Sequence, residues 1–146
     1  MKKSLTLLLV LLATTLTAMA QFEATPDWTM VHEQDEFTVE YRWMDCPDPA
    51  NGMHKEYIVL RYDNRTSSDL IVKFDMERYY NGVCATCANE DNELGRMVEL
   101  PANSVVAGDC TTRDRSQRVF YRMLKPKTNS LLTDLRLLDF TVSTGR

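Results

Sequence analysis

Apolar and polar residues alternate along most of this 146-residue chain, so that neighbouring side chains have opposite character. Alternation with a period of two predicts a β-strand that buries one face and exposes the other. In residues 36–44 (EFTVEYRWM), the apolar face consists of Phe37, Val39, Tyr41 and Trp43. Segments of this kind occupy residues 36–44, 56–64, 70–80, 96–100, 104–108, 117–124 and 133–142. No stretch has a helical period of useful length, so we expect an all-β protein.

The number and spacing of these segments predict the arrangement of the strands. About seven short strands joined by turns, in about 120 residues, are typical of a single antiparallel β-sandwich of immunoglobulin-like type. We expect one such domain over residues 35–144, and a small closed barrel is the alternative fold. Residues 21–34 are expected to form a loosely attached N-terminal lead-in.

The last segment breaks the alternation. Leu135 and Leu137 have one parity, whereas Leu138, Phe140 and Val142 have the other. An unbroken strand would turn one of these two sets toward solvent. A β-bulge inserts one extra residue into a strand and would allow both sets to face the core. We therefore expect a bulge near Leu137 and Leu138.

The first twenty residues have the composition of a secretory signal peptide. Lys2 and Lys3 precede the apolar stretch LTLLLVLLATTLTAMA, whose final AMA fits the small-x-small pattern of a cleavage site before Gln21. The stretch is shorter than the ~20 residues that span a bilayer as a helix, and no later segment is apolar enough to do so. We expect residues 1–20 to be a signal peptide and the protein to be exported to the periplasm or the extracellular space. A signal anchor is the alternative.

The charge argues against one class of partner. The chain has 17 Lys and Arg against 21 Asp and Glu, a formal net charge of −4, and cleavage after residue 20 would remove two of the lysines. An acidic chain has no electrostatic reason to bind nucleic acid or anionic lipid. We expect no nucleic-acid partner, and a cell-envelope protein or glycan remains as the expected kind of partner.

Four cysteines, Cys46, Cys84, Cys87 and Cys110, lie in the part of the chain that would remain after cleavage. In an oxidising compartment, an even set of this kind is expected to form disulfides. Counting antiparallel strands places all four cysteines at one end of the sandwich. Four cysteines allow three pairings, which sequence alone does not separate. Our first expectation is Cys46–Cys84 together with Cys87–Cys110.

The C-x-x-C spacing of Cys84 and Cys87 also occurs in zinc sites and in redox-active dithiols. A four-cysteine zinc site needs all four thiolates around one ion, but Cys46 and Cys110 are isolated in the sequence. A redox dithiol usually lies at a helix N-terminus, which lowers the thiol pKa. Acidic residues and no helical pattern follow Cys87. The pattern favours structural disulfides, and we expect neither a metal nor a cofactor.

No catalytic group stands out among the remaining residues. His32 and His54 are not accompanied by a G-x-S-x-G elbow or a comparable nucleophile, and no two carboxylates are singled out as an acid–base pair. The acidic loop from Asn89 to Glu93 offers alternating oxygen ligands for a cation, but it lacks the glycine and glutamate spacing of an EF-hand. A solvated turn is the simpler interpretation of this loop.

The residues before the C-x-x-C form a candidate binding surface. Tyr79 and Tyr80 are adjacent, so a continuing strand would point them to opposite faces and leave at least one exposed. Asn81, which is followed by glycine, would turn the chain into the cysteine loop. Asn64 begins an N-x-T glycosylation sequon, although an asparagine at this place also favours a turn.

Several short motifs resemble those of small exported proteins of Bacteroidota bacteria. These proteins share an N-G-x-H-x-E lead into a strand, a Y-Y-N-G-x-C-x-x-C loop and a later G-x-C. The matching residues are Asn51, Gly52, His54, Glu56, Tyr79, Tyr80, Asn81, Gly82, Cys84, Cys87, Gly108 and Cys110. The resemblance implies an exported bacterial protein and supplies no catalytic residue.

These observations favour a non-enzymatic binding or accessory module over an enzyme. Loops held rigidly at one end of a β-sandwich are a common place for recognition, and no catalytic constellation competes with that interpretation. The alternatives are a hydrolase of carbohydrate or peptide that uses unassigned carboxylates, and a structural subunit of the cell envelope.

Overall fold

The computed structural model describes residues 22–87 and 93–145. The expected signal peptide (residues 1–20) and residues 89–92 of the acidic loop lie outside these ranges. The described part contains nine strands and one 3-10 helix. In chain order they are β1 (Thr29–Glu33), β2 (Phe37–Asp48), η1 (Pro49–Asn51), β3 (Met53–Asn64), β4 (Leu70–Tyr80), β5 (Val83–Cys84), β6 (Gly95–Leu100), β7 (Val105–Ala107), β8 (Arg118–Lys125) and β9 (Leu132–Thr144).

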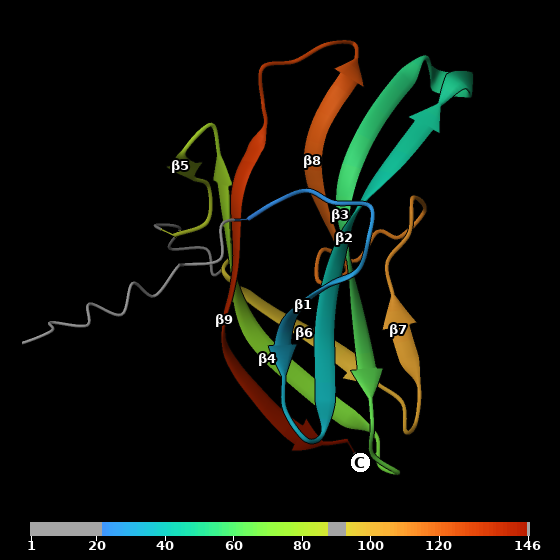
Figure 1. The fold of residues 1–146 in the computed structure, drawn as a ribbon, viewed down its shortest axis with the longest axis vertical. Helices are drawn as coiled ribbons and strands as arrows, with labels where there is room; N and C mark the ends of the chain where they lie inside the picture. Colours follow the sequence, from blue (N-terminus) through green and yellow to red (C-terminus); the bar gives the residue numbers. More distant parts are fainter. Residues whose placement is uncertain (1–21, 88–92, 146) are drawn as a thin grey trace, which may run out of the picture.

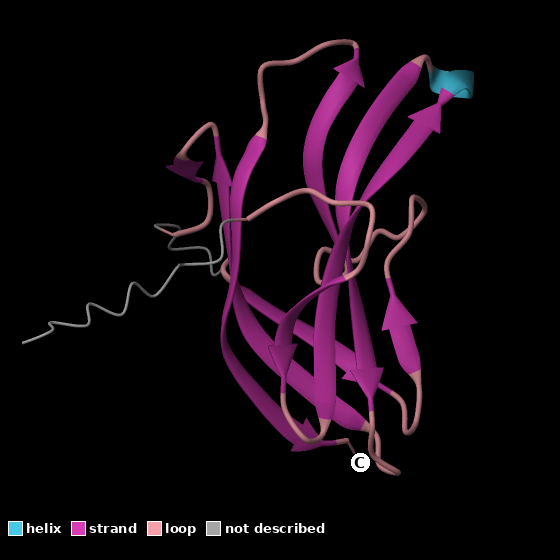
Figure 2. Cartoon of the chain, viewed as in Figure 1, coloured by secondary structure: helices cyan, strands magenta, loops and turns pink. Residues whose placement is uncertain are grey.

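The strands form two antiparallel sheets (Figures 1 and 2). In the first sheet, β2 and β3 pair along their whole length, β1 pairs with the free edge of β2, and β7 and β8 share the other edge of β3. In the second sheet, β9 pairs with one edge of β4, and β5 and β6 share the other. Neighbouring strands are thus antiparallel throughout the described residues.

All seven segments with period-two alternation form strands, but the described residues hold nine strands instead of about seven. The first additional strand, β1, lies within residues 21–34, the expected lead-in, and pairs with β2 in the register Thr29↔Tyr41. The second, β5, has only two residues. A two-residue strand is too short to show any periodicity, which is why the sequence did not reveal it.

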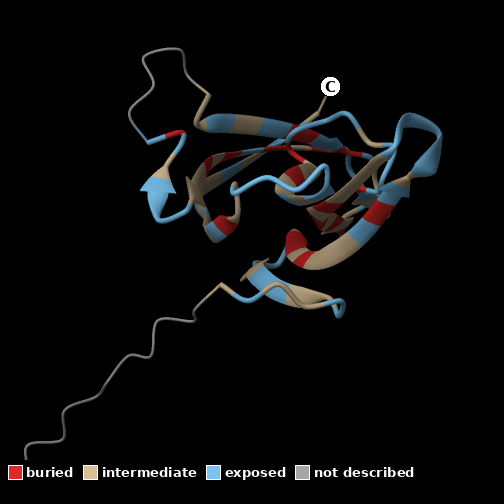
Figure 3. Cartoon of the chain, turned by 90° about the horizontal axis from the view of Figure 1, so that it is seen from above, coloured by how far each residue is buried: buried red, intermediate tan, exposed pale blue. Residues whose placement is uncertain are grey.

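The core lies between the two sheets. Its fully buried residues come from both sheets and include Phe37, Val39, Ile58, Leu60, Tyr62, Val72, Phe74, Met76 and Leu100. Seen from above, the buried positions gather toward the middle of the molecule and the exposed ones toward its periphery (Figure 3). Two antiparallel sheets that bury their apolar faces against each other are consistent with a β-sandwich.

The bulge expected in the last strand is confirmed. β4 and β9 pair at Lys73↔Thr141 and next at Asp75↔Leu138, so β9 contains one extra residue at this place. Asp139, inside the bulge, has a positive φ of 53°. Leu135 and Leu137 pack against the core before the bulge, and Phe140 and Val142 do so after it. Leu138, which was also expected to face the core, is exposed.

The side chain of Asn64 joins two turns. It is 1% exposed, and its Nδ2 donates to the carbonyl oxygens of Ser68, Leu100 and Pro101 at 2.9–3.0 Å. The nitrogen to which a glycan would be attached is therefore buried and occupied. In this fold the asparagine of the N-x-T sequon stabilises the two turns, and its side-chain nitrogen is not accessible for glycosylation.

Two strands, β7 and β8, pair with successive parts of the same edge of β3, and the change from one to the other falls at Leu60. β7 ends its pairing at Arg61↔Ala107, and β8 begins at Val59↔Arg118. Between them, the Leu60 carbonyl accepts a hydrogen bond from Gly108 N at 2.9 Å, and Leu60 N donates to Gln117 O at 2.9 Å. The chain leaves the sheet after Gly108 and returns to it at Gln117. Residues 109–117, hereafter the 109–117 loop, carry Cys110.

Candidate functional site

The four cysteines form two disulfides, Cys46–Cys110 and Cys84–Cys87, with Cα–Cα distances of 5.5 and 5.7 Å. The expected pairing of Cys46 with Cys84 and of Cys87 with Cys110 is therefore wrong. Counting antiparallel strands predicts the end of the molecule at which each cysteine lies, but not the sheet to which it belongs. Cys46 lies on β2 of the first sheet and Cys84 on β5 of the second. Figure 1 shows η1, at the end of β2, and β5 in the upper half of the view but on opposite sides.

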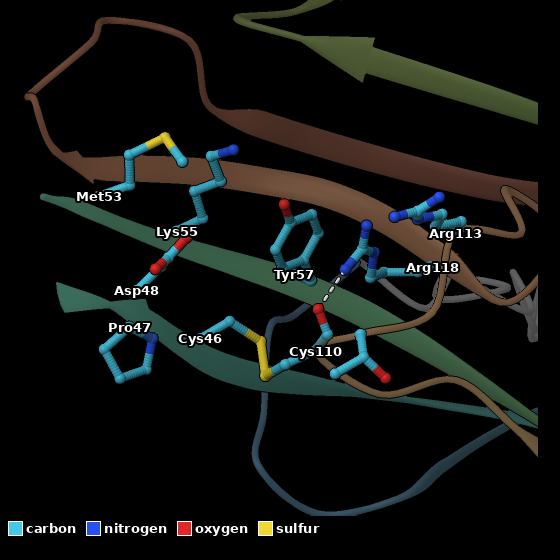
Figure 4. A pocket seen from close by; sticks show the side chains of 10 residues that line it. Cys46, Pro47, Asp48, Met53, Lys55, Tyr57, Cys110, Arg113 and Arg118 are labelled. Atoms are coloured by element: carbon cyan, nitrogen blue, oxygen red, sulfur yellow. Dashed lines mark hydrogen bonds between the residues drawn. A yellow bond between two sulfur atoms is a disulfide. The ribbon is translucent and has the colours of Figure 1, made fainter. Parts of the chain in front are cut away.

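A pocket of about 590 Å³ lies beside the Cys46–Cys110 disulfide (Figure 4). It opens on the face of the first sheet that is turned away from the core. On β3, Ile58 and Leu60 are in the core, so Lys55 and Tyr57 point to the opposite face. Cys46 is the register partner of Lys55 on that face. Residues of four segments line the pocket, namely Cys46, Pro47, Asp48, Met53, Lys55, Tyr57, Cys110, Thr111, Arg113 and Arg118.

The carboxylate of Asp109 shapes the 109–117 loop at its start. Its Oδ1 accepts hydrogen bonds from the backbone N–H and the hydroxyl of both Thr111 and Thr112, at 2.7–3.1 Å. These bonds favour the ionised form, and they lower the pKa of Asp109 from 3.8 to about 2, with the hydroxyl of Thr111 as the largest cause. The ionised carboxylate of Asp109 thus stabilises the conformation of the loop.

The ionisation of Asp109 predicts how the loop responds to acid. Because the folded-state pKa is lowered to about 2, the carboxylate stabilises the folded state above pH ~4, and this contribution is lost as the pH falls toward 2. We expect an NMR titration to place the Asp109 carboxyl midpoint near 2 and the Thr111 and Thr112 amide shifts to follow it. Asp109→Asn should remove this transition from the two amides, and a midpoint near 3.8 would contradict the prediction.

The 109–117 loop turns back to the sheet through a second carboxylate. Asp114 Oδ1 accepts from the N–H and the hydroxyl of Ser116 at 2.8 and 2.7 Å, and its Oδ2 accepts from Gln117 Nε2 at 3.2 Å. Ser116 is buried, and its carbonyl accepts a hydrogen bond from the core residue Tyr62. The loop is therefore fixed to the sheet at both ends, which positions Arg113 between them.

Three cationic side chains line the pocket, and one of them is held in place by its neighbours. The guanidinium of Arg118 donates to the carbonyl oxygen of Cys110 and stacks at 4.3 Å from the centre of the Tyr57 ring. The Tyr57 ring in turn meets Phe120 edge to face, with centroids 6.1 Å apart. Arg118 is thus fixed over an aromatic surface while the Cys46–Cys110 bond fixes its hydrogen-bond acceptor.

The other two cations, Lys55 and Arg113, are not held in this way by the described residues. Among the described residues, neither the side chain of Lys55 nor that of Arg113 makes an ion pair or a hydrogen bond. In the part of the chain that the structure describes, Asp48 is the one carboxylate that lines the pocket, and both its oxygens accept hydrogen bonds from Asn51, at 3.3 and 2.8 Å. The pocket therefore presents an excess of positive charge. Its chemistry suits the binding of an anion and includes no acid–base pair of carboxylates.

The residues expected as a binding surface are held in contacts within the chain. Tyr80 donates its hydroxyl to Phe120 O at 2.7 Å and packs against the core, and burial raises its pKa. Asn81 donates from Nδ2 to Asn129 O and accepts from Leu131 N. Tyr79 is half-buried under the guanidinium of Arg136, 4.7 Å from the ring centre. That these residues form a binding surface stays a prediction.

The remaining candidates are dispersed over the molecule. His32 stacks on Phe140 with ring centroids 4.0 Å apart, and His54 pairs with Asp45. Glu93, at the end of the acidic loop, lies near Arg78 and Arg115, at 3.7 and 3.8 Å. Asn89–Asp91 lies outside the described residues, so cation binding there stays a prediction. No group of three or more His, Cys, Asp or Glu in the described part could hold a metal ion.

Of the pocket residues, the sequence singled out Cys46 and Cys110 but none of the three cations. Lys55 and Tyr57 occupy polar positions of an alternating strand, and such positions normally only face solvent. Arg113 lies in the mixed-charge sequence TTRDRSQR. The available signal was the group of arginines after Cys110. Asp109 and Asp114, which flank the start of this group, each precede the Ser or Thr residues that donate hydrogen bonds to their carboxylates.

Comparisons with known proteins place no relative beside this chain: no family model, no curated protein and no solved structure matches it. Within the described residues, there is no helix of the length and apolar character needed to cross a membrane.

Proposed function

We propose that this protein is an exported, non-enzymatic binding module that holds an anionic ligand in the pocket beside the Cys46–Cys110 disulfide. Residues 1–20 would direct its export, and it would act in the periplasm or outside the cell. We also propose that its fold is of the immunoglobulin-like type and that it belongs with the exported Bacteroidota proteins whose motifs it resembles.

The gathering of Lys55, Arg113 and Arg118 in one pocket of an acidic chain carries this proposal. A chain with a formal charge of −4 has carboxylates with which it could neutralise these cations, yet Lys55 and Arg113 make no ion pair with any described residue. An unpaired cation in a concave site attracts anions from solution, because the pocket walls reduce its screening by water.

The pocket favours a ligand that carries more than one negative group. Figure 4 shows Lys55 and Arg113 on opposite sides of Tyr57, with Arg118 between them. A volume of about 590 Å³ falls within the range of small-molecule sites. An acidic glycan with carboxylates on successive sugars is a ligand that carries several negative groups. Binding is favoured over hydrolysis because the one carboxylate that lines the pocket, Asp48, is occupied by Asn51.

Calorimetric titration with oligogalacturonate tests the proposal. We expect binding that weakens with added salt, and no binding of a neutral oligosaccharide of the same length. The double variant Lys55→Gln/Arg113→Gln should weaken binding at least about tenfold, because it removes the two cations that are free to contact the ligand.

The matched control removes the same charge elsewhere. Lys73 and Lys127 are exposed and lie outside the pocket, so Lys73→Gln/Lys127→Gln should leave the affinity within about twofold of the unmodified protein. Equal weakening by both double variants would show non-specific charge attraction and contradict the proposed site. A chain that binds neither oligosaccharide would favour the structural-subunit alternative.

A further inference from the structure

The two disulfides differ in how they are built into the fold. Cys46–Cys110 joins residues 64 positions apart, and Cys46 is only 7% exposed. Cys84–Cys87 closes a ring of adjacent residues on the second sheet, with Cys87 exposed and Cys84 partly exposed. A reductant can reach the second disulfide from the exposed Cys87 side. The first disulfide is also exposed at Cys110, but it is buried on the Cys46 side and joins two distant segments.

The ring that contains Cys84 and Cys87 is attached to β4 by bonds that do not depend on sulfur. Asn81 and Gly82, with φ of 51° and 80°, form the two-residue turn of the β4–β5 hairpin, as expected for a type I′ turn. Ala85 N then donates to Arg78 O at 2.7 Å. The buried hydroxyl of Thr86 accepts from Arg78 N at 3.1 Å and donates to Met76 O at 3.0 Å.

The same attachments should keep the two cysteines in place after the disulfide is reduced. The turn before Cys84 and the contacts of Ala85 and Thr86, between the two cysteines, hold the C-x-x-C against β4. After reduction, the two thiols would therefore remain close to each other and could re-form the bond. A pair of cysteines that stays in place in both oxidation states meets the geometric requirement for reversible exchange.

The two sulfur atoms have different surroundings. Cys84 Sγ accepts a hydrogen bond from the backbone N–H of Cys87 at 3.0 Å. This bond would strengthen on a thiolate and so stabilise Cys84 as a leaving group. No backbone N–H of the described residues donates to Cys87 Sγ, and Cys87 is the more exposed of the two residues. The Tyr79 hydroxyl lies 3.5 Å from it, under the guanidinium of Arg136.

We propose that Cys84–Cys87 is a thiol–disulfide exchange site that accepts two electrons from a dithiol partner. A partner thiolate attacks Cys87 Sγ, a mixed disulfide forms, and the Cys84–Cys87 bond breaks with Cys84 leaving as a thiolate that then takes up a proton. The second partner thiol, after losing its proton, displaces Cys87. The partner leaves as a disulfide, and Cys84 and Cys87 remain as thiols.

Graded reduction of the native protein tests this site, with Cys46–Cys110 of the same molecule as the control. The protein is incubated with increasing dithiothreitol, quenched with an alkylating agent and mapped by mass spectrometry. We expect alkylation of Cys84 and Cys87 at a dithiothreitol concentration at least about tenfold below that needed for Cys46 and Cys110, because access controls the rate of exchange. Circular dichroism should show the fold retained, and oxidised glutathione should restore the Cys84–Cys87 bond.

A monothiol identifies the attacked sulfur. With reduced glutathione, the mixed disulfide should be found on Cys87 and the alkylating agent on Cys84. Glutathione mainly on Cys84 would overturn the assignment of the leaving sulfur. Reduction of both disulfides together, or reduction of Cys84–Cys87 only after the fold is lost, would overturn the exchange site itself.

Discussion

Gly108→Ala is expected to lower the free energy of unfolding by about 3 kcal/mol or more, as for other substitutions that overpack a tightly packed site. A Cβ at position 108 would lie 2.1 Å from the carbonyl oxygen of Gln117. That oxygen accepts the hydrogen bond of Leu60 N, and Gly108 N donates to the Leu60 carbonyl. The clash therefore involves backbone atoms that cannot move without breaking the hydrogen bonds at Leu60, where β8 follows β7 along the edge of β3. Urea denaturation followed by circular dichroism measures the loss.

A glycine at the end of the chain provides the control for this substitution. A Cβ on Gly145 would approach Asp69 Cβ at 3.2 Å, next to the exposed side chain of Asp69, so Gly145→Ala should change the unfolding free energy by less than about 1 kcal/mol. If Gly108→Ala were as mild as Gly145→Ala, the close approach of Gly108 to Gln117 would not exist in solution. Because Gly108 precedes Cys110 and Gln117 precedes Arg118, the damaged variant should also lose the anionic ligand.

Removal of the Cys46–Cys110 disulfide is expected to lower the free energy of unfolding by at least as much as Gly108→Ala. In the chain-entropy account, a loop of the size closed by Cys46–Cys110 stabilises a protein by about 4 kcal/mol, and a four-residue ring by about 2 kcal/mol. Domains of this size have about 5–15 kcal/mol of stability in total. Cys46→Ser/Cys110→Ser should therefore lower the melting temperature by roughly 15 °C, as measured by thermal denaturation.

The second disulfide is the internal reference for this effect. Cys84→Ser/Cys87→Ser removes the same number of sulfur atoms, but it opens only the short ring, and it should cost about half as much as the first double variant. The same order of effects should appear when each bond is reduced separately. A larger loss from the Cys84 and Cys87 variant would contradict the assignment of the main structural role to Cys46–Cys110.

The strands were predictable because their signal is local. Alternation at Phe37, Val39 and Tyr41 reports burial of one face, whichever strand lies next to it. The bulge could be found in the same way, because the change of parity between Leu137 and Phe140 leaves few other solutions. Its position was off by about two residues, since the sequence does not show that Asp139 takes the positive φ.

The disulfide pairing and the pocket were not predictable because they depend on how distant segments meet. Cys110 reaches Cys46 because the 109–117 loop leaves the edge of β3 between β7 and β8. That exchange of strands depends on hydrogen bonds at Leu60 that no periodicity reports. The same arrangement of β7, the 109–117 loop and β8 brings together Lys55, Arg113 and Arg118. In the sequence, each of them alone is an ordinary surface cation.

The spacing of the two disulfides also sets the order in which the chain can oxidise. Cys84 and Cys87 are neighbours even in an unfolded chain, so their bond can close at any time after synthesis. Cys46 and Cys110 are distant in the sequence, and the fold brings them together when β2 and the segment that follows β7 have both docked on β3. Closure of this second bond is therefore coupled to assembly of the first sheet. A free Cys46 thiol marks a newly made molecule whose first sheet is unfinished.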